Sequence, residues 1–595
     1  MNEVKRRIQS LKRAYRDDGF HGLKILWERQ WIRLLSYPQI HQMNLRHRAA
    51  DAQYQTWFME MRPGEEERRV QAERAFSQEV SFLIPVYNTR PDLLEALVES
   101  FLGQTCPRWQ ACFYDGASTD VKTLELLRTL EERDPRLHVQ FGHRNLGISG
   151  NTNEALKMVT TPVIALCDHD DILAEDAVYW ILDACERGAD FFYSDEDKCN
   201  ADGTVLFDPH MKTDFSPDAL RAGNYICHVM GMSTELIRDL GGLRSECDGS
   251  QDHDLALRAT EKAVCIAHIP RVLYHWRMLN TSYSHASQER CALAALKSVQ
   301  DQLERLDMKA RADMVELNPV ITYEISENTD VSLILHGHEA GLDRRWLKKL
   351  LERTGQSCRW FREIILVGCD VPAGMPASIP IKSAATLNEA ASAAGGKLLL
   401  FLESGTLPVF DLKWLDGLVM YATRPWLGCV GGGIVDQKNN YLMCGYAVNV
   451  PGCALPRFRG ENRMGATYQL YDRKVQDVTA VSSACLMIRR DLFLSMGGFG
   501  EFRSDLRSVS LGMQCMAHGL YNAVIPDSVM RQRHPEKGIV TLPYPDVDCR
   551  LFKSLYGEHP MEHFYSPHFE REVGSMTIDF QRHEQPGTML TRFDG

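Results

Sequence analysis

The sequence predicts an α/β protein in which a mostly parallel sheet is built twice, in two consecutive domains that follow a helical N-terminal segment. Short apolar runs ending in polar loops alternate with stretches of helical periodicity from Val80 onward, a pattern typical of a parallel sheet with crossover helices. The same succession returns about 250 residues later, at Val331. A chain of 595 residues is also too long for one ordinary hydrophobic core.

Residues 1–78 are predicted to form a polar, mainly helical segment. Residues 1–49 contain eleven Lys or Arg and four Asp or Glu, and apolar residues recur at loosely helical spacing between Leu23 and Leu35. This composition is typical of an amphipathic helix on anionic lipid, which predicts peripheral contact with the cytoplasmic face of the inner membrane. A helical hairpin packed on the next domain, with its basic face in solvent, explains the same composition, so both interpretations stay open at this point.

The composition indicates which partners and which cellular compartment are expected for this protein. The net charge of −12 argues against a nucleic-acid-binding protein, which needs a basic surface to displace counterions. The 17 cysteines include no C-x-x-C pair and no zinc-type spacing with histidine, so we expect reduced thiols in a cytoplasmic protein. No apolar run reaches the roughly 18–20 residues of a membrane span, and no apolar stretch follows the basic start as it would in a secretory signal.

Residues 79–310 are predicted to form the first α/β domain. The expected order is a strand from Val80, a helix over 93–102, a strand from Trp109, a helix around 121–133, and strands from Leu137 and Thr161. Ligands bind at the carboxyl ends of the strands in such sheets, so the polar clusters that follow these strands are predicted to meet at one edge.

Residues 328–540 are predicted to form a second copy of this domain, followed by a C-terminal tail at 541–595. The two copies differ where chemistry is expected. The positions of the first copy's clustered aspartates hold Glu403, Ser404, Gly405, Ser508 and Ser510 in the second. Losing several carboxylates removes a divalent metal site, so the second domain is predicted to be non-catalytic, supporting the acceptor site or contacting partner proteins. A second active centre that uses Glu403 and Asp505 is the weaker alternative.

The segment CDHDD, residues 167–171, is the most informative feature of the first domain. Asp168, Asp170 and Asp171 follow an apolar strand, and their mutual repulsion indicates a hard divalent cation, Mg²⁺ or Mn²⁺, that also binds substrate phosphates. An acidic surface turn, with Asp171 capping the next helix, is the structural alternative.

Further polar residues strengthen the metal interpretation. A second strand ends in the carboxylates of Asp195, Glu196 and Asp197. Asp252 and Asp254 begin a helix whose dipole favours ionised carboxylates, one of which could accept a proton from a hydroxyl. After a further strand, an imidazole at position 275 could complete a metal shell, and the guanidinium two residues later could pair with phosphate.

These residues, in this order, resemble the family 2 glycosyltransferases. The resemblance covers about 80–290 and rests on seven motifs: VSFLIPVYNT, DGASTD, NLGISGNTNEAL, CDHDD, YSDEDK, GLRSECDGSQDHDLALR and HIPRVLYHWR. The chain is most similar to the tandem-domain bacterial enzymes, described as rhamnosyltransferase-like, that build O-antigen and other surface polysaccharides. The leader motif YQTWF and the tail motif HFYSPHF also resemble that subset.

The resemblance implies two GT-A domains, of the Rossmann-like nucleotide-diphospho-sugar transferase fold, and direct displacement at the anomeric carbon with inversion. It implies a UDP- or dTDP-sugar donor and a glycan or lipid-linked glycan acceptor. It also implies roles for individual residues: Asp252 as general base; Asp170, Asp171 and His275 as metal ligands; and Pro85, Tyr87, Asn88, Asp115, Asn145, Asn153, Asp168 and Arg277 as donor-binding residues. The pair Asp115-Gly116 departs from the two acids or Asp-Asn of many members, which leaves uridine and deoxythymidine recognition open.

Other function classes fit these residues less well. A glycoside hydrolase also uses paired carboxylates, but does not need clustered aspartates after a nucleotide-type strand. A nucleotidyltransferase shares the fold and would carry a Gly-rich basic loop near the first strand, which IPVYNTRPD lacks. A bifunctional enzyme with two active domains and an inactive sugar-binding or scaffold protein are the remaining alternatives. Asp252 and the intact CDHDD segment argue against the inactive scaffold.

Overall fold

The computed structural model describes residues 37–279, 288–315, 317–337, 342–371, 379–409, 413–534, 538–540, 542–583 and 586–593. The chain divides into two compact units. The described residues of Ala49–Tyr323, His563–His568 and Ile578–Gly595 form what we call the first unit. Those of Met1–Arg48, Glu324–Glu562 and Phe569–Thr577 form the second unit.

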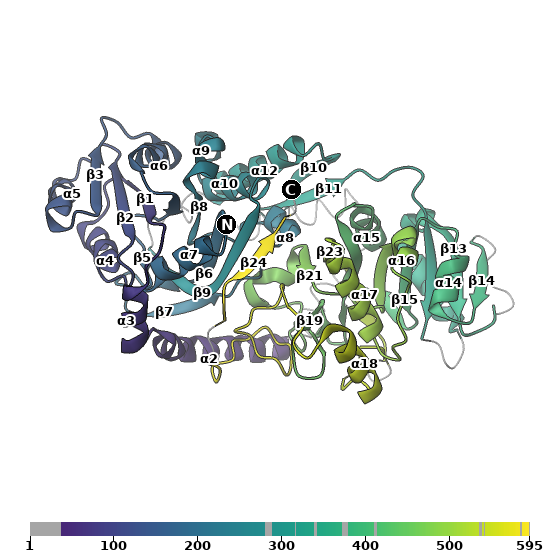
Figure 1. The fold of residues 1–595 in the computed structure, drawn as a ribbon. Helices are drawn as coiled ribbons and strands as arrows, with labels where there is room; N and C mark the ends of the chain where they lie inside the picture. Colours follow the sequence, from purple (N-terminus) through teal and green to yellow (C-terminus); the bar gives the residue numbers. More distant parts are fainter. Residues whose placement is uncertain are drawn as a thin grey trace. The chain divides into compact units, whose positions relative to one another are not determined.

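The first unit is built on a ten-stranded mixed sheet with helices packed against it (Figure 1). Its main strand order is β24-β9-β6-β8-β4-β1-β2-β3, and β5 and β7 pair with β9 and β6 at its margin. The strands are β1 (Val80–Val86), β2 (Trp109–Asp115), β3 (Leu137–Phe141), β4 (Val163–Leu166), β5 (Ile172–Leu173), β6 (Phe191–Cys199), β7 (Leu206–His210), β8 (Met230–Ser233), β9 (Cys265–Arg277) and β24 (Met589–Arg592).

Apolar patterning explains why these segments form a sheet with packed helices. All seven residues of β1 are buried, as expected for a strand covered on both faces. Helix α4 (Pro91–Leu102) buries Leu93, Leu94, Leu97, Val98 and Phe101. It starts with Pro91, which tolerates the first turn of a helix. Helix α5 (Val121–Arg133) is capped by Asp120, whose carboxylate accepts a hydrogen bond from the Thr123 N–H.

The remaining elements of the first unit complete both faces of its sheet. The helices are α3 (Glu65–Glu73), α6 (Gly147–Met158), α7 (Ala177–Glu186), α8 (Pro217–Ala222), α9 (Thr234–Asp239), α10 (Gln251–Thr260), α12 (Gln288–Arg305) and the 3₁₀ turn η1 (Ser245–Cys247). Strands β10 (Ala310–Val315) and β11 (Asn318–Tyr323) form a separate antiparallel pair. Helix α2 (Tyr37–Met61) contributes residues to both units.

The second unit repeats the strand order of the first. Its main order is β14-β13-β12-β15-β22-β17-β23-β16, so its first seven strands correspond one to one with β3-β2-β1-β4-β8-β6-β9. The strands of this path are β12 (Val331–His336), β13 (Phe361–Val367), β14 (Ile381–Ala384), β15 (Leu398–Glu403), β16 (Thr406–Pro408), β17 (Leu427–Val435), β22 (Cys485–Arg489) and β23 (Tyr521–Gln532). The predicted tandem α/β domains are therefore confirmed.

Shorter elements fill out the second unit. Its helices are α13 (Arg344–Thr354), η2 (Gly355–Trp360), α14 (Leu387–Ala393), α15 (Trp414–Ala422), η3 (Tyr468–Arg473), α16 (Arg490–Ser495), α17 (Leu506–Ala517) and α18 (Asp546–Tyr556). Its remaining strands are β18 (Tyr441–Met443), β19 (Tyr446–Val448), β20 (Ala454–Pro456) and β21 (Gln476–Val478).

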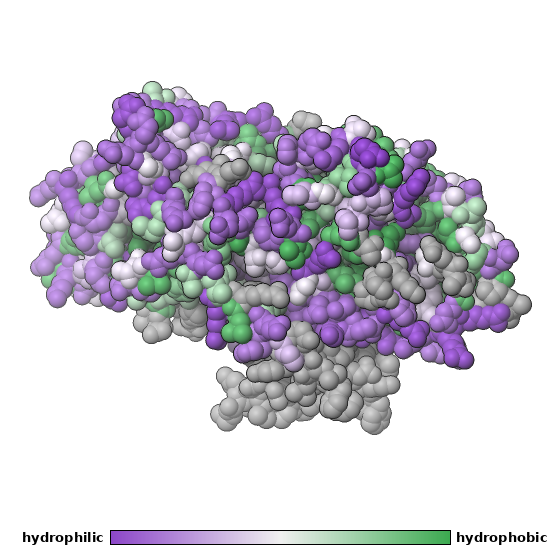
Figure 2. Space-filling view, turned by 90° about the horizontal axis from the view of Figure 1, so that it is seen from below, coloured by the Kyte–Doolittle hydropathy of each residue, from purple (hydrophilic) through white to green (hydrophobic). Residues whose placement is uncertain are grey.

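The predicted amphipathic helix at the N-terminus lies outside the described residues, which begin at Tyr37. In the part of the chain that is described, no helix has the length and apolar character needed to cross a bilayer. The face of the molecule drawn in Figure 2 is mostly hydrophilic, and its hydrophobic residues lie in separate patches.

Candidate active site

The acidic loop that follows β4 contains two kinds of aspartate. Asp168 and Asp170 are partly exposed, with 38% and 26% of their side chains accessible. Asp171 is buried, and both of its carboxylate oxygens accept hydrogen bonds from β9: one from Tyr274 Oη at 2.7 Å and one from the Arg277 N–H at 2.7 Å. Asp171 therefore fastens the acidic loop to β9, and Asp168 and Asp170 are the loop's accessible carboxylates.

Arg277 lies behind the acidic loop. Its Nε donates to the carbonyl of Asp170 at 2.6 Å and its Nη1 donates to the carbonyl of Ala201 at 2.9 Å. The residue is only 2% exposed. These contacts support the backbone of the acidic loop, and the predicted contact of Arg277 with phosphate stays a prediction.

His275 is surrounded by Asp197 and by two residues of helix α2. The Nδ1 of His275 lies 2.6 Å from Asp197 Oδ1, and Asp197 Oδ2 accepts from Tyr54 Oη at 2.7 Å. The ring of Phe58 packs edge-on against the His275 ring at 5.1 Å. Tyr54 and Phe58 belong to α2, so the leader motif YQTWF packs around this histidine. The predicted metal role of His275 stays a prediction.

His228 is the histidine beside the acidic loop. Its Nε2 lies 3.8 Å from Asp168 Oδ2, and its ring stacks on that of Tyr274 at 4.7 Å. Sequence reasoning missed this residue, because the segment YICHVM contains no acidic cluster or spacing that marks a ligand. Its place before an antiparallel strand is set by pairing between β8 and β4.

The pKa of Asp168 reflects the charges of the other acidic residues near it. Enclosure of its carboxylate by protein raises the pKa of Asp168, the neighbouring His228 opposes this rise, and the negative charges of Asp170 and Asp252 add to it. The negative charges of Asp170 and Asp252 therefore act on the carboxylate of Asp168. A divalent cation would relieve that repulsion.

Asp252 and Asp254, which the sequence places together at the start of α10, have separate environments. Asp252 is partly exposed, and its Oδ2 accepts a hydrogen bond from Asn224 Nδ2 at 2.8 Å. Asp254 is fully buried between Arg244 and Arg258, with an Arg258 Nη2 to Asp254 Oδ2 distance of 2.8 Å. Despite burial, these two guanidinium groups lower the pKa of Asp254, so it stays ionised.

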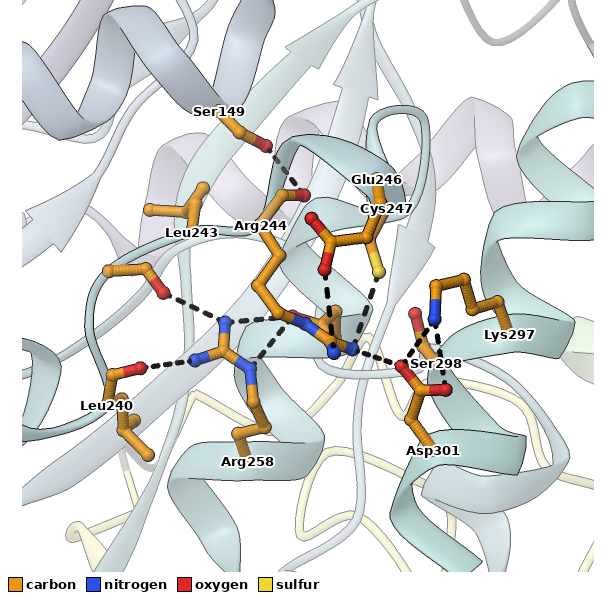
Figure 3. A network of polar contacts seen from close by, with 12 residues as sticks. Ser149, Leu240, Leu243, Arg244, Glu246, Cys247, Arg258, Lys297, Ser298 and Asp301 are labelled. Atoms are coloured by element: carbon orange, nitrogen blue, oxygen red, sulfur yellow. Dashed lines mark hydrogen bonds and ion pairs between the residues drawn. The ribbon is translucent and has the colours of Figure 1, made fainter. Parts of the chain in front are cut away.

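The arginines around Asp254 anchor α10 to its neighbours (Figure 3). Arg244 also reaches Asp301 of α12 at 2.8 Å, and Asp301 pairs with Lys297 at 2.9 Å. Arg258 donates to the carbonyl of Leu240 at 3.1 Å. This network fixes the N-terminal end of α10, where Asp252 is found.

The predicted nucleoside-binding residues at the ends of β1 and β2 join the two loops that follow these strands. Asn88 Oδ1 accepts from the N–H groups of Thr119 and Asp120, at 2.8 and 3.1 Å. Asp115, at the end of β2, is buried, and one of its carboxylate oxygens accepts from the Ser118 N–H at 3.1 Å. Pro85 lies within β1, and Tyr87 just after it is 44% exposed. These contacts hold two crossover loops together at the carboxyl edge of the sheet.

Asn145 lies in the loop before α6 and Asn153 lies within α6, and the two side chains have different partners. Asn145 Oδ1 accepts from the Gly147 N–H and from Asn151 Nδ2, each at 3.0 Å. Asn153 uses both atoms of its amide on the backbone of Leu243. Asn145 thus shapes the loop before α6, whereas Asn153 ties α6 to the chain after α9.

The surroundings of Gly116 explain why the sequence after β2 is Asp115-Gly116 and not a pair of acidic residues or Asp-Asn. A Cβ at this position would lie 2.4 Å from Nδ2 of Asn151, closer than side-chain atoms approach in proteins. Asn151 in turn accepts from the Leu146 N–H at 3.1 Å, which holds it in place. A side chain at 116 therefore requires Asn151 to move.

The corresponding acids of the second unit are saturated by the protein itself. Glu403 accepts from Gln532 Nε2 at 2.7 Å and from the Ile539 N–H at 2.8 Å. Asp505 is fully buried, and its carboxylate accepts from Tyr446 Oη at 2.7 Å and from the Ser483 N–H at 3.1 Å, among other donors. Through these hydrogen bonds, both carboxylates hold neighbouring segments of the chain in place. Across the described ranges of both units, no group of three or more His, Cys, Asp or Glu side chains is arranged to hold a metal ion.

Comparison with known proteins bears on this geometry. Residues 81–239 match the family model described as glycosyl transferase family 2. The chain is 29% identical over 478 residues to the uncharacterized protein y4gI of Sinorhizobium fredii, covering 75% of this chain and 52% of that protein. It is 27% identical over 543 residues to the O-antigen biosynthesis protein RfbC of Myxococcus xanthus, covering 86% of this chain and 42% of that protein. The chain thus spans about half the length of these relatives.

Among solved structures, the chain is similar to S. aureus TarS 1-349 in complex with UDP-GlcNAc. The match has a TM-score of 0.32 and 16% sequence identity, and it covers 38% of this chain and 66% of that one. A mannosyltransferase from Pyrobaculum calidifontis, solved with GDP-Man and Mn²⁺, matches with a TM-score of 0.30 and 16% identity over 46% of this chain and 76% of that one.

Proposed function

We propose that the protein moves a sugar from a nucleoside-diphosphate donor to a hydroxyl of a glycan, because residues 81–239 match the family model described as glycosyl transferase family 2. The relative RfbC, named for O-antigen biosynthesis, supports a place in bacterial surface polysaccharide synthesis. The observation that carries the proposal is the pair of accessible carboxylates, Asp168 and Asp170, in the loop after β4 of the segment that matches the family model. The acceptor we propose is a glycan or a lipid-linked glycan.

The accessible carboxylates of Asp168 and Asp170 fit a hard divalent cation, which takes oxygen ligands and keeps positions open for phosphate. We assign the cation to these two residues, whereas Asp171, whose oxygens are both occupied by β9, positions their loop. Mg²⁺ or Mn²⁺ bound there would neutralise the charge that develops on the leaving diphosphate.

Asp252 is the residue we propose as general base. It is partly exposed at the N-terminus of α10, where the helix dipole favours the ionised carboxylate. Asn224 orients one of its oxygens. The base accepts the acceptor's proton as the hydroxyl oxygen attacks the anomeric carbon opposite the diphosphate. Such a direct displacement inverts the anomeric configuration without a covalent intermediate.

The donor's nucleoside is proposed to lie against the loops that follow β1, β2 and β3. Pro85, Tyr87, Asn88, Asp115 and Asn145 shape that edge, and the exposed Tyr87 ring could stack on a base. A UDP- or dTDP-sugar is the donor class that we propose. For Asn153 and Arg277, the described contacts favour a supporting role.

The second unit is proposed to be non-catalytic. Glu403 and Asp505 each accept several hydrogen bonds from the protein, which leaves little capacity for a cation. A bifunctional enzyme and an inactive sugar-binding scaffold are the competing functions. Peripheral membrane contact through the basic N-terminal segment stays part of the proposal.

A donor screen tests this function. UDP- and dTDP-sugars are incubated with the protein, with Mn²⁺ or with chelator, and the released nucleoside diphosphate is measured. We expect metal-dependent release that Asp252→Asn abolishes. The control Asp239→Asn changes an exposed aspartate at the end of α9 and should leave release intact. Release that persists in chelator would refute the proposed mechanism.

A further inference from the structure

A cavity of about 470 Å³ lies within the first unit, outside the acidic loop. Its described lining comes from α2, α4, β5, the turn between β6 and β7, β9 and the tail, and it does not include Asp168, Asp170 or Asp252. The volume falls in the range of roughly 300–1,000 Å³ that is typical of pockets for small molecules. The cavity is therefore large enough to hold a ligand of its own.

The walls of the cavity are largely apolar. Helix α2 contributes Trp57, Phe58 and Met61 to the lining, and β5 contributes Ile172 and Leu173. Such walls favour an apolar portion of a ligand, because contact removes the apolar surfaces of both partners from water.

The carboxylates that line the cavity are already engaged by the protein. Each accepts a hydrogen bond from a neighbouring side chain: Glu175 from Arg62, Asp176 from Trp180, and Glu99 from Arg133. These carboxylates therefore offer little attraction to a cation from solution, and the charge of Arg62 is balanced by its own ion pair with Glu175.

In the described part of the chain, Arg271 is the lining arginine that has no carboxylate at ion-pair distance. Its Nη2 donates to the carbonyl of Pro586 at 3.2 Å, and its guanidinium lies 3.6 Å from the ring centre of Trp180. Its buried Nε has no hydrogen-bond partner among the described residues. Burial lowers the pKa of Arg271 to about 10 despite the charges of Asp176 and Glu67, so the group is still a cation at neutral pH.

We propose that this cavity binds an amphipathic anion, with its apolar chain between α2 and β5 and its charged head paired with Arg271. A carboxylate or phosphate head supplies the charge-assisted hydrogen bonds that the protein does not give this guanidinium. A neutral apolar molecule would leave the charge without a partner, and a small inorganic anion would leave the apolar walls without one. The proposal does not depend on the glycosyl transfer, whose cation and base residues lie outside the described lining.

Calorimetric titration of the full-length protein tests this site. Decyl phosphate and decanoate are titrated below their micelle-forming concentrations, and decanol and inorganic phosphate serve as matched controls for the chain and for the head. We expect saturable binding of one anion per chain, at least about tenfold tighter than either control. Tighter binding of decyl phosphate assigns the site to a lipid phosphate, and tighter binding of decanoate assigns it to a fatty acid.

Variants separate the contribution of the head from that of the chain. Arg271→Gln should weaken binding of the anion by about tenfold or more and leave decanol binding unchanged, whereas Arg271→Lys, which keeps the charge, should recover part of the affinity. Ala96→Leu adds volume to the α4 wall of the cavity and should weaken binding of every ligand that has a chain. Arg311→Gln, on β10 and outside the described lining, is the control and should bind as the unmodified protein does.

Three results would overturn the proposal. In the first, neither decyl phosphate nor decanoate binds the unmodified protein. In the second, decanol binds as tightly as the anions, so that the charge plays no part. In the third, the affinity for the anion is the same in Arg271→Gln and Ala96→Leu as in the unmodified protein. Circular dichroism verifies the fold of each variant, and if Arg271→Gln does not fold, Ala96→Leu and Arg271→Lys still test the chain and the charge separately.

Discussion

Asn153 holds the backbone of Leu243 with both atoms of its side-chain amide: Oδ1 accepts from the Leu243 N–H and Nδ2 donates to the Leu243 carbonyl, each at 2.8 Å. The second unit repeats this clip, since Asn388 Oδ1 accepts from the Phe499 N–H and its Nδ2 donates to the Phe499 carbonyl, each at 2.9 Å. A contact kept in both units, whose acidic residues differ, favours a role in folding over a role in donor binding.

The first prediction concerns this clip. Asn153→Ala leaves the N–H and carbonyl of the buried Leu243 without partners, which should cost about 2 kcal/mol or more of unfolding free energy. UDP affinity of the folded protein should be unchanged. Thermal unfolding and calorimetric titration with UDP measure the two effects, with Asn388→Ala as the matched variant in the second unit. Weaker UDP binding at unchanged stability would instead support the donor-binding role predicted for Asn153.

The second prediction compares the acids of the two units. Asp170→Asn should lower turnover by about 100-fold or more, because one ligand of the proposed cation is lost. Burial, together with the charge of Asp505, raises the pKa of Glu403 to about 8, despite hydrogen bonds from Ile539 and Gln532. Glu403 is therefore mostly protonated at pH 7, and Glu403→Gln should retain turnover within about twofold. Equal losses in the two variants would indicate two active centres.

The third prediction concerns Asn224, which donates to Asp252 Oδ2 at 2.8 Å. Without this hydrogen bond the proposed base loses its orientation, so Asn224→Ala should lower kcat by about tenfold or more and leave the donor KM unchanged. Asp252→Asn should have the larger effect, about 100-fold or more, because no base is left. Steady-state kinetics measure both variants. A rise in donor KM with constant kcat would place Asn224 in donor binding instead.

The fourth prediction tests the tight approach at Gly116. Gly116→Ala places a Cβ against Asn151 and should displace that side chain, lowering both the thermal unfolding temperature and the affinity for UDP. The double variant Gly116→Ala/Asn151→Ala removes the clash and should regain part of the UDP affinity. If the double variant is no better than Gly116→Ala, the clash with Asn151 is not the cause.

The fifth prediction follows from His268, which is buried between two carboxylates. Its Nε2 lies 3.0 Å from Asp195 and its Nδ1 lies 2.9 Å from Asp214, and Asp214 also contacts His563 of the tail at 2.8 Å. Burial opposes the charged imidazolium, but the charges of Asp195 and Asp214 outweigh it and raise the pKa of His268 to about 9.

Because this pKa is higher in the folded state than the ordinary value of about 6.5, the stabilisation is fully present below pH 6.5 and is lost as the pH rises through about 9. The thermal unfolding temperature should fall between pH 6.5 and pH 9.5. In His268→Gln that fall should be smaller, because the titrating group is gone. If the thermal unfolding temperatures of the wild-type protein and of His268→Gln fall in parallel over this pH range, His268 is not the titrating group.

Much of the fold could be predicted from sequence, because it depends on local patterns. The apolar run from Val80, the helical spacing of Leu93, Leu97 and Phe101, and their return from Val331 predicted two α/β domains, and the matching strand orders confirm them. The motifs also predicted a resemblance to the family 2 glycosyltransferases, and residues 81–239 match the model of that family. The individual site residues stay predictions.

The partners of individual side chains were decided only by tertiary structure. Asp170 and Asp171 are neighbours in sequence, yet only the carboxylate of Asp171 is hydrogen-bonded to β9, more than a hundred residues along the chain. Asp252 and Asp254 are likewise separated by the arginines that surround only Asp254. Strand register cannot be read from composition or spacing. Because register determines which face of the sheet a side chain lies on, it also determines the partners of that side chain. The sequence by itself determined that acidic groups gather at the sheet's edge, and the tertiary structure decided which of them remain accessible.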